Sequence, residues 1–331
     1  MHAESVAHRR ARRRVVAGFA GLLVLGARPL RALDAAPSVT LIVPSRSGAS
    51  ADRLGRIVAE GLSKVLATPV KVQNIVGDSG VAGTNAIAAG ARDGTVLGLA
   101  ISSAIIGGRL LSPNAKFSPV DDFHWFSVIG TFPGAMVVSA ESPYRNIEDW
   151  LAAARETPRP WVYASLGAGS AGHLAGAWLR LEQGARLVHR PVDSNEERYR
   201  LLAEGKIDVL FEGVPNAKVK SLAPRYRILA VTSAARVPAL PAVPAFGELW
   251  GQSFVVWIAL VAPRGLDQAA HIRIASALGV LLSDPQHAER LRAEGLTFMG
   301  SSGRGTIAFL ESEFLRNAKL IATLTEEGQR K

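Results

Sequence analysis

Residues 39–58 read VTLIVPSRSGASADRLGRIV, and residues 161–179 read WVYASLGAGSAGHLAGAWL. Each stretch opens with a run of apolar, β-branched or aromatic residues that predicts a strand. A loop rich in glycine and serine follows, and an apolar pattern with helical spacing closes the stretch. The same strand–loop–helix device therefore occurs twice in one chain, which favours an α/β fold.

Outward from these two stretches, short apolar runs alternate with amphipathic segments, as is typical of α/β layers. The expected strands are 39–43, 70–73, 96–101, 126–138, 161–166, 187–192, 207–212, 226–232, 254–262 and 296–300. The expected helices are 52–66, 83–91, 147–156, 171–182, 196–203, 268–282, 285–294 and 306–324.

Two long apolar runs, Phe126–Val138 and Phe254–Ala262, flank a middle block that is itself a complete α/β unit. We interpret this block as a domain inserted into another: residues 37–135 and 255–331 form lobe 1, and residues 136–254 form lobe 2. Two strands crossing between lobes create a hinge and a cleft, where small-molecule sites tend to lie. One continuous large sheet is the alternative layout.

The beginning of the chain is typical of an export signal. Residues 9–14 (RRARRR) precede eleven apolar residues, 15–25 (VVAGFAGLLVL), and small residues follow. This apolar run is too short to span about 30 Å of hydrocarbon. We therefore predict a signal peptide over residues 1–36, of Sec or twin-arginine type, cleaved after Ala32, Ala35 or Ala36, and a periplasmic location.

Composition narrows the function classes. The 331 residues include no cysteine, which excludes disulfide scaffolds, cysteine zinc sites and thiol catalysis. The net charge of +10 falls to +5 without residues 1–36, which hold seven arginines and two acids. This weak positive field suits small anions rather than nucleic acid. The seven histidines are scattered, so we expect no metal site.

The two glycine- and serine-rich loops are candidate anion sites. Small residues let the backbone approach a ligand closely, and the first turn of each following helix offers unpaired N–H donors at the positive end of its dipole. A carboxylate held from both sides gains about 1.5–3 kcal/mol per charge-assisted hydrogen bond.

The second loop also fits two enzyme motifs. Its GAGSAG at 167–172 matches the dinucleotide pattern G-x-G-x-x-G, with Asp193 following at a second strand end. Its Ser170 resembles the nucleophile of a serine hydrolase, for which Asp208 and His271 follow in the right order. An exported serine hydrolase and a dinucleotide-binding enzyme therefore stay open as alternatives.

Several segments together follow the pattern of one family. Its V-P-x-x-x-G-G-x-x-D is similar to VPSRSGASAD at 43–52, and its Y-A-S-x-G-x-G-S-x-x-H-L-A-G to YASLGAGSAGHLAG at 163–176. Its G-x-V-D-L-x-F is similar to GKIDVLF at 205–211, and its A-V-T-S-A-x-R-x-P-A-L-P-x-V-P to AVTSAARVPALPAVP at 230–244. The chain thus resembles the solute receptors of tripartite tricarboxylate transporters, the TctC-like or Bug-type receptors.

The resemblance implies a two-lobed periplasmic-binding-protein fold of the flytrap type that closes on a small organic acid. It also implies a receptor that is no enzyme, needs no cofactor, acts as a monomer and delivers its ligand to membrane permease subunits. The family's P-Y-K-G-G segment is replaced by Pro191 to Asn195, so Asp193 and Glu212 are expected to alter specificity at the distal end of the ligand. The predicted ligand-binding residues are Ser45, Arg46, Ser47, Gly48, Ala49, Ser50, Asp52, Ser102, Ser165, Gly167, Ala168, Gly169, Ser170, His173, Asp193, Ser194 and Glu212.

Overall fold

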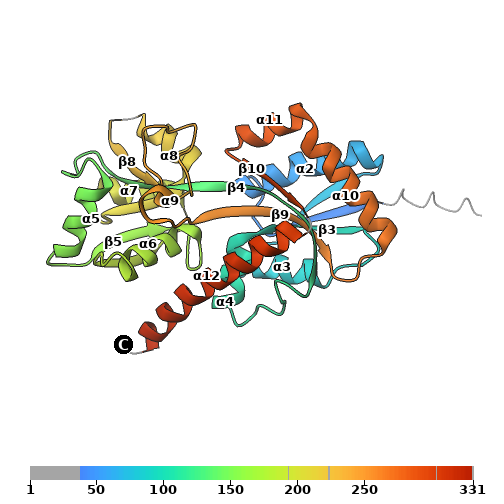
Figure 1. Ribbon diagram of the computed structural model, residues 1–331, viewed down its shortest axis with the longest axis horizontal. Helices are drawn as coiled ribbons and strands as arrows, with labels where there is room; N and C mark the ends of the chain where they lie inside the picture. The colour runs from blue at the N-terminus through green and yellow to red at the C-terminus, as the bar shows by residue number, and fades with distance from the viewer. Residues whose placement is uncertain (1–37, 193, 223, 303, 330–331) are drawn as a thin grey trace, which may run out of the picture. The chain divides into compact units, whose positions relative to one another are not determined.

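The computed structural model describes residues 38–192, 194–222, 224–302 and 304–329. Ser38–Lys331 form one compact unit, shown in Figure 1. The predicted export signal and Asp193 lie outside the described residues.

The described strands are β1 (Val39–Val43), β2 (Val70–Asn74), β3 (Val96–Ile101), β4 (Phe123–Ser139), β5 (Trp161–Ser165), β6 (Leu187–Pro191), β7 (Val209–Gly213), β8 (Tyr226–Val231), β9 (Val255–Pro263) and β10 (Thr297–Ser302). The longer helices are α2 (Ser50–Leu66), α3 (Val81–Ala88), α5 (Ile147–Glu156), α6 (Ala171–Leu181), α7 (Asn195–Ala203), α8 (Val214–Ser221), α10 (Gln268–Ser283), α11 (Pro285–Ala293) and α12 (Arg304–Gln329). Shorter pieces are α4 (Arg109–Leu111), α9 (Phe246–Trp250), a 3₁₀ turn (Asp78–Gly80) and a π-helical segment (Ser103–Gly108).

The strands are hydrogen-bonded in one path with the order β2-β1-β3-β9-β4-β7-β5-β6, and β8 and β10 also pair with β4. The path is continuous because the long strand β4 pairs with β9 and β10 along its first part and with β7 and β8 along its second part. Parallel triplets lie at both ends: β1 pairs with β2 and β3, and β5 pairs with β6 and β7. In each triplet the carboxyl ends of the strands meet at one edge, where α/β proteins bind ligands.

The long strand β4 changes partner in its middle. It pairs with β9 from Phe123 to Pro133, and from Gly134 onward with β7. Pro133 has no N–H to donate to the ladder, so regular pairing with one neighbour ends readily there. Figure 1 shows β4 and β9 running side by side between the two groups of elements. The two crossing runs predicted from the sequence are thus β4, which extends past both expected ends, and β9, which is shifted by one residue.

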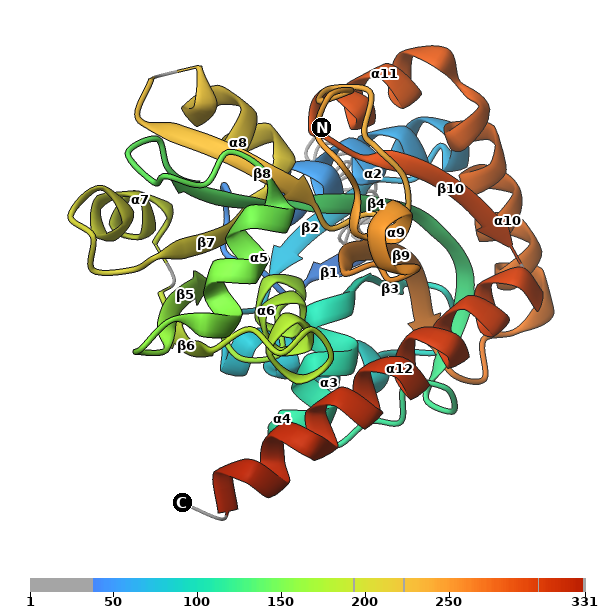
Figure 2. The same ribbon diagram turned by 60° about the vertical axis from the view of Figure 1, so that its left-hand side comes forward.

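Separate hydrophobic cores form on the two sides of this partner change. The β1 triplet packs against α2 and α10, where Leu54, Val58 and Leu62 line the buried face of α2. The β5 triplet packs against α5 and α6 around Trp150 and Trp178. Helix α12 contacts both: Leu310 packs in a core beside β3 and β9, and Leu320 packs in the core of α5 and α6. Figure 2 shows α12 crossing in front of the strands.

Several boundaries differ from the sequence expectation. The helix expected at 83–91 spans Val81–Ala88, and the strand expected at 296–300 spans Thr297–Ser302. Helix α8, the short α9 and the segment Ser103–Gly108 were not expected. Helix α8 was not expected because a proline usually interrupts a helix. Pro215 is at the second position of α8, where a proline is tolerated. None of the helices in the described ranges is long and apolar enough to cross a membrane.

Candidate ligand-binding site

The first loop, residues 44–49, joins β1 to α2. Asp52, in the first turn of α2, holds this loop through its buried carboxylate. That carboxylate accepts hydrogen bonds from the backbone N–H of Gly48 (2.8 Å), the amide of Asn74 (2.9 Å) and Nε of Arg56 (3.0 Å). Burial opposes its ionisation, but the hydrogen bonds from these three groups outweigh burial and hold the pKa of Asp52 below its ordinary value. Asp52 thus fixes the loop in shape.

The second loop, residues 166–169, joins β5 to α6. Gly167 and Gly169 have positive φ angles of 153° and 75°, and glycine adopts the latter without strain. Ser170 is the N-cap of α6: its Oγ accepts from the backbone N–H of His173 (3.2 Å) and donates to the carbonyl of Gly167 (2.8 Å). Hydrogen bonds between residues close in sequence therefore fix the conformation of this loop.

Two stacked histidines, His173 and His189, pack beside the second loop and hydrogen-bond to it and to the strand end before it. The rings of His173 and His189 lie 4.1 Å apart between centroids. His173 Nδ1 accepts from the N–H of Gly169 (3.0 Å), and His189 Nε2 contacts Oγ of Ser165 (2.8 Å). Burial lowers the pKa of His173 to about 4 and that of His189 to about 3, so both rings are neutral near pH 7. A neutral ring is required for Nδ1 to act as an acceptor.

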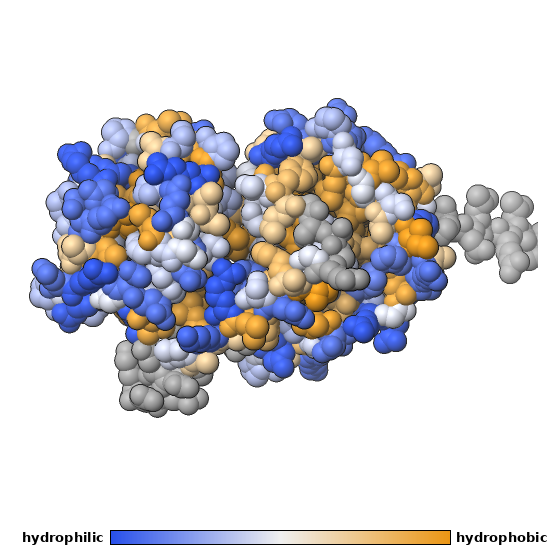
Figure 3. Space-filling model, viewed as in Figure 1, coloured by the Kyte–Doolittle hydropathy of each residue, from blue (hydrophilic) through white to orange (hydrophobic). Residues whose placement is uncertain are grey.

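Both loops line one cavity of about 880 Å³. It lies at the carboxyl ends of β1, β3, β5 and β7, the position expected for a ligand site in this kind of sheet. Figure 3 shows the surface indented between the regions of α8 and α11, and Pro215 and Asn216 of α8 and Ala293 of α11 line the cavity. The cavity is thus bounded by elements from both ends of the sheet.

Nine of the predicted ligand-binding residues line this cavity: Ser45, Arg46, Gly48, Ala49, Ser50, Ser165, Ser170, Ser194 and Glu212. Seven others do not line it: Ser47, Asp52, Ser102, Gly167, Ala168, Gly169 and His173. Of these seven, Asp52 and His173 hold the loops as described above. Ser102 accepts a hydrogen bond from the backbone N–H of Trp257 (3.2 Å) and lines a smaller space beside Gly169.

The cavity exposes backbone donors at the starts of two helices. The first N–H groups of an α-helix have no partner within the helix. Ser50 and Ala51 begin α2, Ala171 and Gly172 begin α6, and all four residues line the cavity. Within the described part of the chain, no group accepts a hydrogen bond from these four N–H donors. Two positive helix ends therefore border the same space.

Most charged groups that line the cavity already have a partner. Nε of Arg53 bonds Glu294 at 2.8 Å, and Glu212 accepts from Arg198 at 2.6 Å. Arg46 in the first loop is exposed, and its guanidinium has no ion-pair partner among the described residues. Arg46 is therefore a cation that remains available to an anionic ligand at the entrance.

A single threonine links the strands where they pass between the two cores. Thr232 lines the cavity, and its Oγ1 donates to the carbonyl of Phe254 and accepts from the N–H of Gly134 (3.0 Å). Its backbone bonds the same two residues, at 2.7 Å and 2.8 Å. Thr232 thus ties β4 to the start of β9 beside the partner change.

Comparison with known proteins decides the family. A model of the tripartite tricarboxylate transporter family receptor matches residues 54–325. The chain belongs to this receptor family. The family is one of binding receptors rather than of enzymes.

Relatives of this receptor cover nearly its full length. A Pseudomonas protein from the tcbD-tcbE intergenic region is 31% identical over 315 residues, which are 94% of each chain. An R. palustris protein solved with adipate is 27% identical, with a TM-score of 0.75 over 86% of this chain and 97% of its own. The periplasmic binding protein BugD is 23% identical, with a TM-score of 0.72 over 86% and 97% of the two chains. The predicted family and fold class are confirmed.

The two enzyme alternatives find no support in the receptor's geometry. Asp208 accepts hydrogen bonds from Arg159 and from the N–H of Val162, and His271 contacts His124. Neither makes a hydrogen bond to Ser170 among those of the described residues. The glycines of the G-x-G-x-x-G pattern shape the loop, and only the last of the three lines the cavity.

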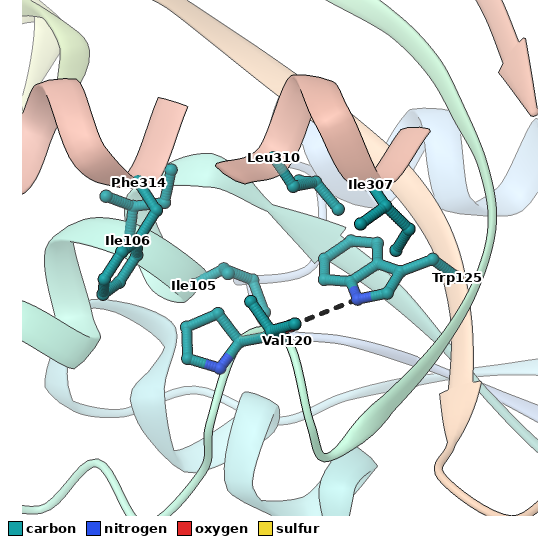
Figure 4. A pocket seen from close by; sticks show the side chains of 8 residues that line it. Ile105, Ile106, Val120, Trp125, Ile307, Leu310 and Phe314 are labelled. Carbon is teal, nitrogen blue, oxygen red and sulfur yellow. Dashed lines mark hydrogen bonds between the residues drawn. The ribbon is translucent and has the colours of Figure 1, made fainter. Parts of the chain in front are cut away.

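A second, apolar pocket lies under α12, where Ile307 and Leu310 lie beside Trp125 and Phe314 lies beside Ile106 (Figure 4). Its volume is about 10 Å³, at the lower limit for one water molecule. Trp125 Nε1 donates to the carbonyl of Pro119 at 3.1 Å. This pocket is a packing gap of the receptor rather than a ligand site.

Sequence reasoning missed lining residues from the end of β3 and the segment after it, from the crossing strands, from the end of β8, and from α8 and the end of α11. They include Ile101, Ser103, Phe132, Pro133, Gly134, Pro215, Asn216, Thr232, Val256, Ile258, Ala293 and Glu294. The partial signal for them was the pair of apolar crossing runs, which predicted a cleft without showing which side chains face it.

Proposed function

We propose that this receptor works in the periplasm, where it captures one small carboxylate between its two loops and delivers it to the permease of a tripartite transporter. The observation that supports this most directly is the shared cavity with unpaired N–H donors from the starts of α2 and α6. Backbone amides at helix N-termini bind carboxylates well. The relative solved with adipate, at 27% identity, supports an organic acid as the ligand class.

Capture would stabilise a closed form of the molecule. We assign residues 37–135 and 255–331 to one lobe and 136–254 to the other, because β4 changes partner at Pro133–Gly134 and β9 begins at Val255. A ligand that contacts both lobes binds the closed form better and shifts the population toward it. The permease would then recognise the closed form. Residues 1–36 would direct export by the Sec or twin-arginine route, and the exported receptor would act as a monomer.

Two glycines allow the proposed lobes to approach each other closely. A Cβ on Gly107 would lie 2.6 Å from the carbonyl oxygen of Gly169. A Cβ on Gly295 would lie 2.3 Å from Cγ of Pro215. Glycine at both positions therefore permits close contact on two sides of the cavity, which would exclude water from the bound ligand.

The test removes single amide donors without breaking a helix. Proline is favoured at the first helical position and has no N–H. Ala171 and Ser50 hold that position in α6 and α2, and the preceding residues have ψ angles of 155° and 163°, which suit a following proline. Ala171→Pro and Ser50→Pro should each lose about tenfold or more in carboxylate affinity, because a charge-assisted hydrogen bond contributes about 1.5–3 kcal/mol.

Gln268→Pro, at the first position of α10 after a residue with ψ of 154°, is the matched control. Calorimetric titration of the chain from residue 37 with a panel of carboxylates should show unchanged affinity for this control. Wild-type affinity in both Ala171→Pro and Ser50→Pro would contradict the proposed binding mode. Failure of the wild type to bind any carboxylate would contradict the proposed ligand class.

A further inference from the structure

One acidic side chain faces the cavity from a buried position. Glu212 lines the cavity near the end of β7, opposite Ala135 of β4, and its side chain is only 4% exposed. One carboxylate oxygen accepts from Arg198 at 2.6 Å, and the other accepts from the backbone N–H of Gly213 at 2.7 Å. A buried carboxylate is stable only with such partners.

The partner of Glu212 is enclosed completely. The side chain of Arg198 is 0% exposed and does not line the cavity, so the carboxylate is the member of the pair that faces the ligand space. The guanidinium also donates to the carbonyl of Val192 (2.7 Å) and to the amide oxygen of Asn195. Its Nε has no hydrogen-bond partner within the described part of the chain. Arg198 is thus a fixed cation with one donor unused, screened from the cavity by Glu212.

The cavity-lining residues next to Glu212 in the chain and at the end of β8 carry no positive charge. Thr232, which also lines the cavity, already spends its hydroxyl on the carbonyl of Phe254. Phe211 and Pro215 give the neighbouring surface an apolar character. A second carboxylate placed here would meet the carboxylate of Glu212, whose partner Arg198 is enclosed, whereas an apolar group would lose little on leaving water.

We propose that the Arg198–Glu212 pair is a specificity device that restricts the receptor to acids with one carboxylate and an uncharged distal end. This inference rests on the proposed capture of a carboxylate by the two loops and names the class of that ligand. Glu212 acts by masking the charge of Arg198. Removing the mask should convert the same position into a second anion subsite.

The test compares hexanoate with adipate, which have the same number of carbons and differ by one carboxylate, together with the four- and eight-carbon pairs of the same kind. Titration calorimetry should show that the wild type binds the monocarboxylate of each pair at least about tenfold more tightly. Glu212→Gln should raise the ratio of adipate to hexanoate affinity by about tenfold or more. Glu212→Ser is a second variant with the same expectation, in case the glutamine variant does not fold.

The double variant Arg198→Met/Glu212→Gln is the matched control, because it removes the mask and the cation together. It should show no gain for adipate. A wild type that prefers dicarboxylates would overturn the inference, and so would an adipate gain that persists in the double variant. If no acid of either series binds the wild type, the proposed function itself fails, which is a distinct result.

Discussion

Replacing Asp52 by alanine should weaken ligand binding although this side chain does not line the cavity. The substitution deprives the Gly48 N–H and the Asn74 amide of their acceptor. The Arg56 side chain is 53% exposed and regains water, so we leave it out of the estimate. Two hydrogen bonds to a carboxylate together contribute about 3 kcal/mol. Because Gly48 is exposed, its N–H can bond water in the variant, which recovers part of this free energy.

The remaining loss of loop stabilisation is about 2 kcal/mol. Without the anchor, the ligand must order the loop when it binds, so the binding free energy is reduced by this amount. Affinity should therefore fall about thirtyfold. The pKa of Asp52 lies below its ordinary value, so the carboxylate stays ionised and the loss should be constant between about pH 5 and 8. Titration calorimetry with the best-binding carboxylate measures the effect directly.

Asp93→Ala is the matched control. Asp93 also accepts from a backbone N–H, that of Thr95 at 2.9 Å, but it shapes a turn that does not line the cavity. Its variant should bind within about twofold of the wild type. If Asp52→Ala also binds within that range, the first loop does not need this anchor and the argument for the first loop is wrong.

Three further predictions concern the second loop and the crossing strands. Ser170→Ala should fold with a loss of about 1 kcal/mol, measured by denaturant unfolding, because an N-cap is lost; it should still bind its ligand, whereas complete loss of function would favour the hydrolase alternative. Thr232→Val should destabilise the protein by about 2 kcal/mol in the same assay, since the Gly134 N–H and the Phe254 carbonyl lose their partner, and an unchanged midpoint would refute this role. Burial lowers the pKa of His173 to about 4 and that of His189 to about 3, so the unfolded chain binds protons that the folded chain does not, and stability should fall as pH drops from about 6.5 toward 4, with each histidine contributing about 1.4 kcal/mol per pH unit. His173→Asn keeps an acceptor for the Gly169 N–H and should reduce the slope by the His173 contribution; a profile as steep as that of the wild type would show that His173 does not contribute to the slope.

Much of the site followed from local rules. The loop at Ser165–Ser170 was predictable because a strand end, positive-φ glycines and a serine N-cap all lie within a few residues of one another. Pairing of the two loops around one space was predictable because the two apolar crossing runs indicated a cleft between the two blocks that carry the loops. The family pattern added the position of His173, whose role the structure gives as support for Gly169.

The remainder depended on contacts between residues far apart in sequence. Thr232 reaches Gly134 across 98 positions, and no local pattern predicts that partner. Arg198 of α7 forms an ion pair with Glu212 of β7. The sequence showed Glu212 as an acidic residue but did not show that its charge is compensated. The π-helical segment at Ser103–Gly108 was missed because its glycines and β-branched residues favour a loop or strand when considered alone.

The central claim is that one carboxylate is held between the N–H groups that begin α2 and those that begin α6. A crystal structure of the chain from residue 37 with its tightest-binding carboxylate tests it most directly. The account predicts carboxylate oxygens within hydrogen-bond distance of the Ser50 or Ala51 N–H and of the Ala171 or Gly172 N–H, directly or through one water. A carboxylate bound elsewhere in the cavity, with these amides facing only solvent, would contradict it.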